Sequence, residues 1–198
     1  MSERWPVAII TGRSVADVKT RLGFHPRYVI GNHGAEDPTL GPPSSASQAL
    51  DSIRQRIAAH VESMRRCGIV VEDKQYSIAL HYRLAPDAGA ALVCIEELLQ
   101  GMEPALKRFG GKCVVNVMAI GLPDKGDALA ALVRREGAGG AVFVGDDVND
   151  EAVFMRATPH WLTVKIGRDD PLSRAMFFLD SDAELVMVLE KMLAFGGR

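Results

Sequence analysis

Short apolar runs alternate with stretches of helical spacing near both ends of the chain. The runs at residues 7–10 and 141–144 have the length and composition of buried parallel strands. Further strands are expected at 28–30, 161–167 and 177–179, with amphipathic helices in the intervening sequence. Strands that alternate with helices are typical of an α/β fold built on a parallel sheet.

The middle of the chain has a different pattern. Residues 37–47 are rich in proline, glycine and serine, which predicts a linker. An amphipathic helix is expected from about residue 46 to residue 66, followed by a β-hairpin from residues 69–73 and 77–83. A helix at 87–102 and a strand at 113–118 complete an α+β segment.

These patterns divide the chain into two units. With 198 residues, of which 47% are hydrophobic, the chain can bury a sizeable core and also carry an inserted lobe. We predict an α/β core from residues 1–43 and 121–198 and a small inserted α+β domain from residues 44–120.

The net charge and the cysteine content limit which binding partners and which cellular compartment are expected. A net charge of −2 gives no reason to expect nucleic acid or an acidic membrane surface. The three cysteines have no metal-ligand spacing, and their odd number fits a reducing compartment. No apolar run has the length of a membrane span, and no leader pattern opens the chain. We therefore expect a cytoplasmic protein, and the sequence does not indicate its oligomeric state.

Three acidic residues follow the strand at 141–144, namely Asp146, Asp147 and Asp150. Open α/β sheets bind their ligands at the carboxyl ends of the strands. Carboxylates that converge there repel one another unless a cation such as Mg²⁺ neutralises them. In the alternative interpretation, Asp147 or Asn149 only caps the following helix.

Polar residues also follow other expected strands. Thr11 and Arg13 flank a glycine after the first strand, which suits the binding of an anion. Lys125 lies in the first turn of a helix, where the helix dipole disfavours a cation, so it is expected to serve a nearby anion. His33 and Glu36 follow the strand at 28–30. Each of these assignments has an alternative that remains open. The residues after the first strand could form an ordinary turn, and Lys125 could be a surface lysine. His33 could be a structural histidine, and Glu36 could be a solvated acid.

The second strand of the hairpin has two different faces. Its alternation places Ser77, Ala79, His81 and Arg83 on one face and apolar residues on the other. The polar face could bind a sugar or phosphate, or it could be the solvated side of an ordinary antiparallel sheet.

Six motifs follow one another in order along the chain, at residues 8–14, 31–36, 71–74, 80–83, 124–126 and 145–150. Together they resemble the trehalose-6-phosphate phosphatases of the haloacid dehalogenase-like (HAD) superfamily, over nearly the full length. The Thr-Gly-Arg and Asp-Asp elements are common to the superfamily. The Gly-Asn-His-Gly-Ala-Glu element and the Glu-Asp-Lys and His-Tyr-Arg pair are specific to the trehalose-phosphate branch.

The resemblance implies a fold and a chemistry. The fold is a Rossmann-like parallel-sheet core with an inserted cap domain. The implied activity is Mg²⁺-dependent hydrolysis of a sugar phosphate through an aspartyl-phosphate. Thr11 and Lys125 would bind the phosphoryl group, and Asp146, with Asp147 and Asp150 as further ligands or orienting groups, would hold Mg²⁺.

The resemblance also implies a sugar-binding set from both domains. The core side of the pocket would be shaped by Arg13, Asn32, His33 and Glu36. The cap would close over the sugar with Glu72, Lys74, His81 and Arg83.

The sequence departs from the family pattern in two places. The family begins with a strand that ends in Asp-x-Asp-Gly-Thr, whose first aspartate attacks phosphorus, and no such sequence precedes Val7. That strand lies centrally in the superfamily, so its absence would leave a gap in the sheet or force the strands at 7–10 and 141–145 together. In the last cap strand, Asn116 and Met118 replace the residues that usually bind the sugar.

Three hypotheses follow. The leading one is a trehalose-6-phosphate-phosphatase-type protein that is inactive in this form. As the reason for the inactivity, we favour a chain that starts late within a longer reading frame over an inactive relative. The second is a non-catalytic module that binds a sugar phosphate. The third, motivated by Asn116 and Met118, is a phosphatase for another sugar phosphate.

Overall fold

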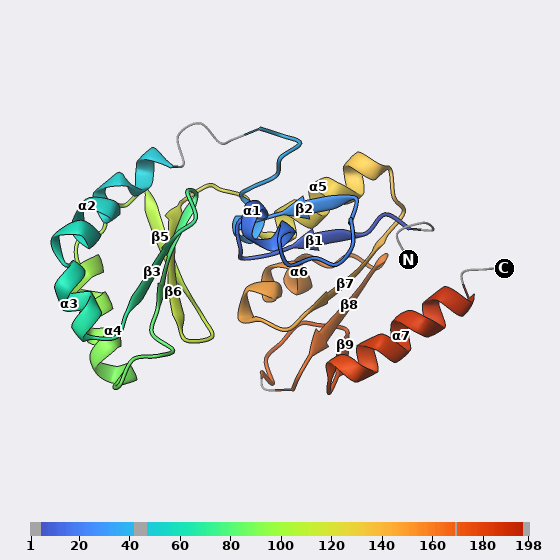
Figure 1. The fold of residues 1–198 in the computed structure, drawn as a ribbon. Helices are drawn as coiled ribbons and strands as arrows, with labels where there is room; N and C mark the ends of the chain where they lie inside the picture. The colour runs from blue at the N-terminus through green and yellow to red at the C-terminus, as the bar shows by residue number, and fades with distance from the viewer. Residues whose placement is uncertain (1–4, 42–46, 169, 196–198) are drawn as a thin grey trace.

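Two lobes with different kinds of sheet make up the molecule (Figure 1). The structure is a computed structural model, which describes residues 5–41, 47–168 and 170–195. The predicted linker partly lies outside the described residues, because residues 42–46 are not among them. The described parts confirm the predicted fold class, with a parallel α/β core and an antiparallel α+β lobe. Within them, no helix is long and apolar enough to cross a membrane.

The core lobe contains two separate parallel sheets. One pairs β1 (Ala8–Ile10) with β2 (Tyr28–Ile30), with Ile9 opposite Val29. The other has the order β7-β8-β9, and its strands are β7 (Ala141–Gly145), β8 (Trp161–Ile166) and β9 (Phe177–Leu179). In the described part of the chain, β1 pairs only with β2, and β7 pairs only with β8. Strands β1 and β7 therefore belong to separate sheets and do not pair with each other in the described residues, so of the two expected outcomes the structure shows a break in the core sheet.

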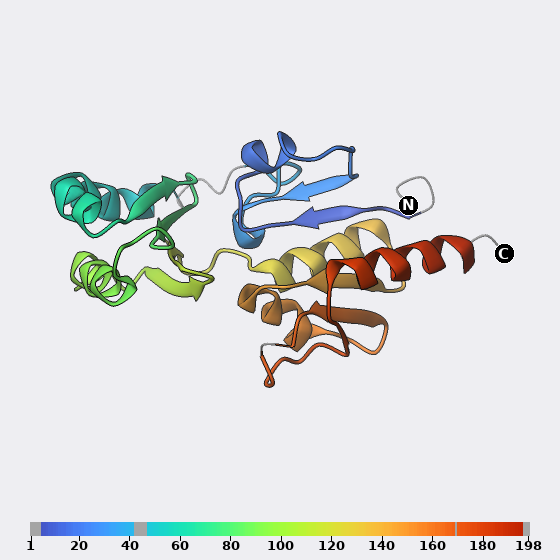
Figure 2. The ribbon, with the colours of Figure 1, turned by 60° about the horizontal axis from the view of Figure 1, so that its bottom comes forward.

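Helix α5 (Lys125–Glu136) packs against both sheets and holds the core lobe together (Figure 2). Its Leu129 packs in a cluster with Phe143, and its Leu132 packs in a second cluster with Ile30. Ile10 contacts both clusters. The other helices of this lobe are α1 (Val15–Lys19), η1 (Asn32–Gly34), η3 (Val148–Asp150), α6 (Glu151–Arg156) and α7 (Asp182–Phe195).

The predicted burial of two core strands is wrong. Ala8, Ile9 and Ile10 of β1 are only half-buried, and the side chain of Val142 in β7 is 48% exposed. The reason is their position: β1 and β7 each lie at the edge of a small sheet, so neighbouring strands cover them on one side only.

The antiparallel lobe has the strand order β3-β4-β6-β5. Its strands are β3 (Val70–Asp73), β4 (Ser77–His81), β5 (Leu106–Gly111) and β6 (Val114–Ala119). The helical segments η2 (Gln48–Leu50), α2 (Asp51–Ala59), α3 (Val61–Arg66) and α4 (Ala88–Leu99) accompany this sheet (Figure 1). Ile78 and Leu80 are fully buried in the core of this lobe, which confirms the predicted apolar face of the hairpin strand.

Two elements of this lobe differ from the prediction. The helix expected over about 46–66 is interrupted at His60, which has φ −117° and ψ 14° and whose Nδ1 lies 2.8 Å from the Arg56 carbonyl oxygen. Strand β5 was not predicted, because two charged residues separate its Leu106 from its Phe109 and two glycines follow.

Candidate functional site

The loops that follow β1 and β2 are joined by their backbones. The Thr11 N–H donates to the Ile30 carbonyl (2.9 Å), and the Asn32 N–H donates to the Arg13 carbonyl (2.8 Å). The Thr11 hydroxyl oxygen accepts a hydrogen bond from the Arg13 backbone N–H (3.2 Å). The Arg13 guanidinium extends outward and forms an exposed ion pair with Asp17 at 2.8 Å. Thr11 and Arg13 are thus positioned on a fixed turn at the strand end.

An unusual turn places His33 directly against Gly12. Asn32 and His33 have left-handed φ values of 48° and 58°, which the Asn residue tolerates better than most. The His33 N–H donates to the Thr11 carbonyl (2.8 Å). A Cβ at position 12 would lie 2.5 Å from the His33 Cε1, so a glycine is needed there.

Asn32 is fully buried at the junction of the two lobes. Its side-chain amide donates to Glu36 Oε2 (2.8 Å) and to the Lys74 carbonyl (3.1 Å), and its oxygen accepts from the Ser77 hydroxyl (2.6 Å). Glu36 Oε2 also accepts from the Val15 N–H (2.9 Å) at the start of α1. Both side chains therefore join structural elements in this conformation, and their predicted contact with a sugar stays a prediction.

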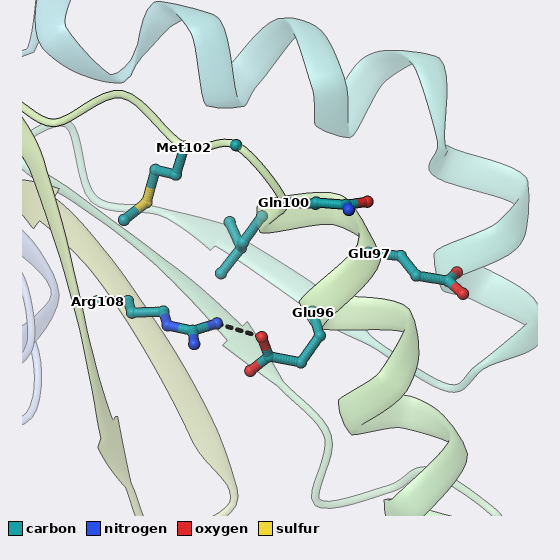
Figure 3. Close-up of a pocket in the computed structure, with 7 residues that line it drawn as sticks. Glu96, Glu97, Gln100, Met102 and Arg108 are labelled. Atoms are coloured by element: carbon teal, nitrogen blue, oxygen red, sulfur yellow. Dashed lines mark hydrogen bonds and ion pairs between the residues drawn. The ribbon is translucent and has the colours of Figure 1, made fainter.

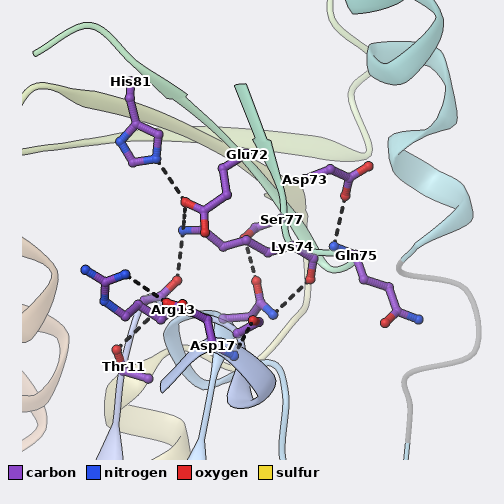
Figure 4. A network of polar contacts seen from close by, with 12 residues as sticks. Thr11, Arg13, Asp17, Glu72, Asp73, Lys74, Gln75, Ser77 and His81 are labelled. Atoms are coloured by element: carbon purple, nitrogen blue, oxygen red, sulfur yellow. Dashed lines mark hydrogen bonds and ion pairs between the residues drawn. The ribbon is translucent and has the colours of Figure 1, made fainter. Parts of the chain in front are cut away.

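The β3–β4 hairpin brings three of the four predicted lobe residues together (Figure 4). Lys74 Nζ donates to the Gly12 carbonyl of the core (2.9 Å) and lies 3.7 Å from Glu72 Oε2. The His81 Nε2 is 3.0 Å from the same Glu72 oxygen. Burial lowers the pKa of Lys74 from its usual value. Arg83 lies apart from this group: it is exposed beyond the end of β4, and its guanidinium donates to the Lys112 carbonyl (3.4 Å).

His33 is a buried histidine between the lobes whose ring nitrogens have no hydrogen-bonding partner in the described structure. It is 8% exposed, and no described residue hydrogen-bonds either ring nitrogen. Its ring meets that of Phe109 edge-on, with the centroids 5.0 Å apart. Burial, reinforced by the charges of Lys74 and Lys125, lowers the pKa of His33 to about 4. The imidazole is therefore neutral near pH 7, with one N–H donor and one acceptor nitrogen.

Lys125 and Asp150 form a buried ion pair beside the end of β7, with Lys125 Nζ 2.6 Å from Asp150 Oδ1. The second Asp150 oxygen accepts from the Asp147 N–H (2.9 Å). A Cβ on Gly145 would fall 2.3 Å from the Asp150 carboxyl carbon, so the glycine allows the carboxyl group to lie against the strand end. The anion that Lys125 contacts in this structure is the Asp150 carboxylate.

The three predicted metal ligands are not assembled as one shell. Among the described residues, no group of three His, Cys, Asp or Glu side chains is arranged to hold a metal ion. Asp150 is engaged by Lys125 and by the Asp147 N–H. Asp146 is exposed, and no described residue hydrogen-bonds or pairs with its carboxylate, while Asp147 is half-buried. Oxygen donors from Asp146 and Asp147 suit Mg²⁺, which commonly binds one or two carboxylates and completes its octahedron with water and phosphate oxygens.

Sequence reasoning missed two contacts between the lobes. Phe109 covers His33 from the unpredicted strand β5, and Asn149 Nδ2 donates to the Gly110 carbonyl at 3.5 Å. Neither residue has a neighbouring pattern that signals such a contact. Asn116, which was singled out, is buried on β6 opposite Ala79.

A separate surface hollow of about 540 Å³ lies on the antiparallel lobe (Figure 3). Arg108 and Glu96 form an ion pair at its wall. None of its lining residues belongs to the predicted site. The hollow is therefore distinct from the loops at the strand ends.

Comparison with solved structures identifies the fold. A trehalose-6-phosphate phosphatase related protein matches with a TM-score of 0.75 and 21% identity, over 98% of this chain and 83% of its own. The C-terminal domain of the C. albicans trehalose-6-phosphate phosphatase matches with a TM-score of 0.75 and 20% identity, over 94% of this chain and 77% of its own. The fold is that of the HAD-like hydrolases, as the sequence motifs predicted.

Sequence comparison identifies the family. The family model for trehalose-phosphatase matches residues 1–171. A probable trehalose-phosphate phosphatase of Sinorhizobium fredii is 36% identical over 86% of this chain and 66% of its own length. The trehalose-phosphate phosphatase of Mycobacterium bovis is 27% identical over 97% of this chain and 52% of its own. The chain belongs to the trehalose-phosphatase family, and it spans about half the length of the mycobacterial relative.

Proposed function

We propose that this chain forms the sugar-phosphate site of a Mg²⁺-dependent trehalose-6-phosphate phosphohydrolase of the aspartyl-phosphate type. The observation that carries the proposal is the closure of the hairpin over the strand ends. Lys74 reaches from the antiparallel lobe to the Gly12 carbonyl, directly beside Thr11. The named function of the family relatives supports the same substrate class.

The phosphoryl group would be bound by the Thr11 hydroxyl and the Lys125 ammonium group. The ion pair with Asp150 fixes the Lys125 side chain in place before substrate arrives, so no reorganisation is needed as negative charge develops. Asp146 and Asp147 would hold Mg²⁺, which would neutralise phosphoryl charge. This assignment keeps Asp150 as the residue that positions Lys125.

The sugar would lie between the lobes, beside the neutral His33 imidazole, whose ring nitrogens have no hydrogen-bonding partner in the described structure, although the nearby Asn116 side chain opposes the lowering of its pKa. A neutral imidazole can donate to one hydroxyl and accept from another. Glu72, Lys74 and His81 would contact the sugar from the hairpin. The closed lobes would also exclude water from the site.

The attacking carboxylate is the missing part of this chemistry. In the family pattern it lies on a strand that residues 1–198 do not contain. We therefore propose that these residues bind the substrate and hydrolyse it negligibly, either because they are part of a longer protein or because they form an inactive relative.

Calorimetry with trehalose 6-phosphate, with and without Mg²⁺, tests the proposal alongside an assay of phosphate release. We expect binding without release, and loss of binding in Lys125→Met. Lys112→Met, which removes an exposed lysine, is the matched control. Absence of binding would refute the proposed site. Mg²⁺-dependent release that Asp146→Ala abolishes would show that an attacking group is present after all.

A second candidate is a phosphatase for another sugar phosphate. Asn116 and Met118, both buried on β6, motivate it because a methionine cannot replace a guanidinium that binds sugar hydroxyls. Calorimetry with a panel of sugar phosphates decides between the two substrates. The specific ligand should bind at least about tenfold more tightly than the other sugar phosphates, which corresponds to about 1.4 kcal/mol of binding free energy.

A further inference from the structure

The turn between β3 and β4 carries Lys74 to the core lobe. The Lys74 N–H donates to the Ser77 carbonyl across the turn (2.9 Å), and the ammonium group donates to the Gly12 carbonyl (2.9 Å). The next residue, Gln75, has a left-handed φ of 73°, a conformation that costs free energy in any residue other than glycine. The position of Lys74 therefore depends on a turn that needs support from the groups around it.

The Arg54 guanidinium on α2 supports this turn on both sides of Lys74. Its Nε donates to Asp73 Oδ2 (2.6 Å), and its Nη2 donates to Asp73 Oδ1 (3.1 Å) and to the Gln75 carbonyl (3.1 Å). Asp73 Oδ1 also accepts from the Gln75 N–H at 2.9 Å (Figure 4). The residues before and after Lys74 are thus held in one closed set of hydrogen bonds.

The same guanidinium joins the turn to the rest of the antiparallel lobe. Its Nη1 donates to Asp51 Oδ1 (2.8 Å) and to the carbonyl of Ser47, which precedes η2. Ile53, the neighbour of Arg54 on α2, is fully buried in the core of this lobe and anchors the helix. A planar guanidinium with donors in a fixed fork suits the bonding of several acceptors at once. Arg54 therefore fixes the turn relative to α2.

Arg65 on α3 shows how an ordinary surface arginine of this lobe differs. It donates to both oxygens of Glu62 on the same helix (2.9 and 3.2 Å), and the two side chains are 75% and 65% exposed. Exposed ion pairs of this kind contribute at most about 1 kcal/mol to stability. Arg54 is 27% exposed and bonds acceptors from three separate segments. Its contacts are those of a residue that positions one segment against others.

We propose that Arg54 is a positioning residue for the sugar-phosphate site, because it holds the β3–β4 turn in the conformation that delivers Lys74 to the core. Arg54 bonds the two neighbours of Lys74 in the chain and acts on the site through them. Its effect on ligand binding rests on the proposed function. Its hold on the Lys74 side chain does not, since that contact with Gly12 is made without a ligand.

Acetylation by limiting acetic anhydride, followed by mass spectrometry, tests the hold on Lys74. In the parent protein Lys74 should react slowly, because its side chain is only 7% exposed. We expect Arg54→Met to speed acetylation of Lys74 by about tenfold relative to the exposed Lys112. Asp73→Ala, which removes the carboxylate bonded by Arg54 and by the Gln75 N–H, should act in the same direction.

Two comparisons separate this effect from general unfolding. Arg65→Met, the matched control in the same lobe, should leave the rate at Lys74 unchanged. Lys125 is buried in the core lobe, so its rate should stay low in Arg54→Met. An unchanged rate at Lys74 in both Arg54→Met and Asp73→Ala would overturn the proposal. An equal rise at Lys74 and Lys125 would also overturn it, because it would show that the whole protein opens.

A double-mutant cycle in calorimetry connects the hold on Lys74 with ligand binding. With trehalose 6-phosphate and Mg²⁺ as the probe, Arg54→Met should weaken binding about tenfold in the parent protein and less than about twofold in a Lys74→Met background. Equal losses in the two backgrounds would overturn the positioning role. Absence of binding by the parent protein would contradict the proposed function, whereas the acetylation rates would still decide whether Arg54 holds Lys74.

Discussion

Lys125 and Asp150 are bonded to each other across the site, with 2.6 Å between the ammonium nitrogen and the carboxylate oxygen. Lys125 lies in the first turn of α5, and Asp150 immediately precedes α6. Both side chains are almost inaccessible to water. Each charge therefore depends on the other, since a buried ion that loses its partner is left uncompensated.

Removal of the Lys125 charge should strongly destabilise the fold. We expect Lys125→Met to lower the free energy of unfolding by about 3–5 kcal/mol, because it leaves the Asp150 carboxylate unpaired. The double variant Lys125→Met/Asp150→Asn should recover part of this loss in urea denaturation. Lys112→Met should change stability by less than about 0.5 kcal/mol. A loss below about 1 kcal/mol in Lys125→Met would show that the pair is not buried in solution.

Gly12→Ala should destabilise the loop after β1 by steric overlap. The new methyl group would lie 2.5 Å from His33 Cε1, so we expect a loss of about 1–3 kcal/mol in thermal or chemical unfolding. In a His33→Ala background the same substitution should cost much less, because the ring is gone. Gly23→Ala, which meets nothing within 4 Å, is the matched control. Equal costs in the two backgrounds would contradict the assigned contact.

Stability should depend on pH through His33. Burial and the charges of Lys74 and Lys125 lower its folded pKa from 6.5 to about 4, and Asp147 opposes them. Between these values the unfolded chain binds a proton that the folded chain excludes, so the free energy of unfolding falls as pH falls from 6.5 to 4.

Protonation of His33 should lower the free energy of unfolding by at most about 3 kcal/mol, and this loss is absent above the pKa of the unfolded chain. Denaturation at several pH values should therefore show a shallower slope in His33→Gln over that window. His25→Gln, at an exposed position, should keep the parental slope. Unchanged slopes in both variants would contradict the burial of a neutral His33.

Asn32→Ala should loosen the contact between the two lobes. The substitution removes the partner of Ser77 and Lys74 on the hairpin and of Glu36 in the core, and it should cost about 3 kcal/mol. Small-angle scattering should show a larger radius of gyration if the lobes separate. Ser52→Ala is the control, because the buried Ser52 hydroxyl has no partner in the described structure and its removal should be neutral or stabilising. An Asn32→Ala protein as stable and compact as the parent would contradict this role.

The sequence predicted the positions of most strands and the residues at their ends. Short apolar runs bounded by glycine were sufficient for β1, β2 and β7, because the local pattern alone specifies such strands. Strand β5 was missed because Leu106 and Phe109 are its only large apolar residues and the two glycines at its end suggest a turn. The break at His60 was missed because the apolar spacing continues across it.

The candidate site was predicted as a set of residues but not as a set of contacts. The motif that contains Asn32 and Glu36 pointed to a binding surface, whereas the structure uses both to join the core to α1 and the hairpin. Likewise, the acidic cluster could not show that Asp150 is engaged by Lys125, because the two residues lie 25 positions apart in the chain. Contacts of this kind depend on tertiary packing, which residue spacing does not encode.

The break in the core sheet also has a consequence for the order of folding. The antiparallel lobe is continuous in sequence from η2 to β6 and has its own hydrophobic cluster, so it can form early from contacts of moderate sequence separation. The β1–β2 ribbon has no backbone pairing to β7 in the described structure, and it gains its position from α5 and from the Lys74–Gly12 and Asn32–Ser77 contacts. The β1–β2 ribbon should therefore dock only after both α5 and the β3–β4 hairpin have formed. By the same reasoning, it is the first part of the core to open when either partner fluctuates.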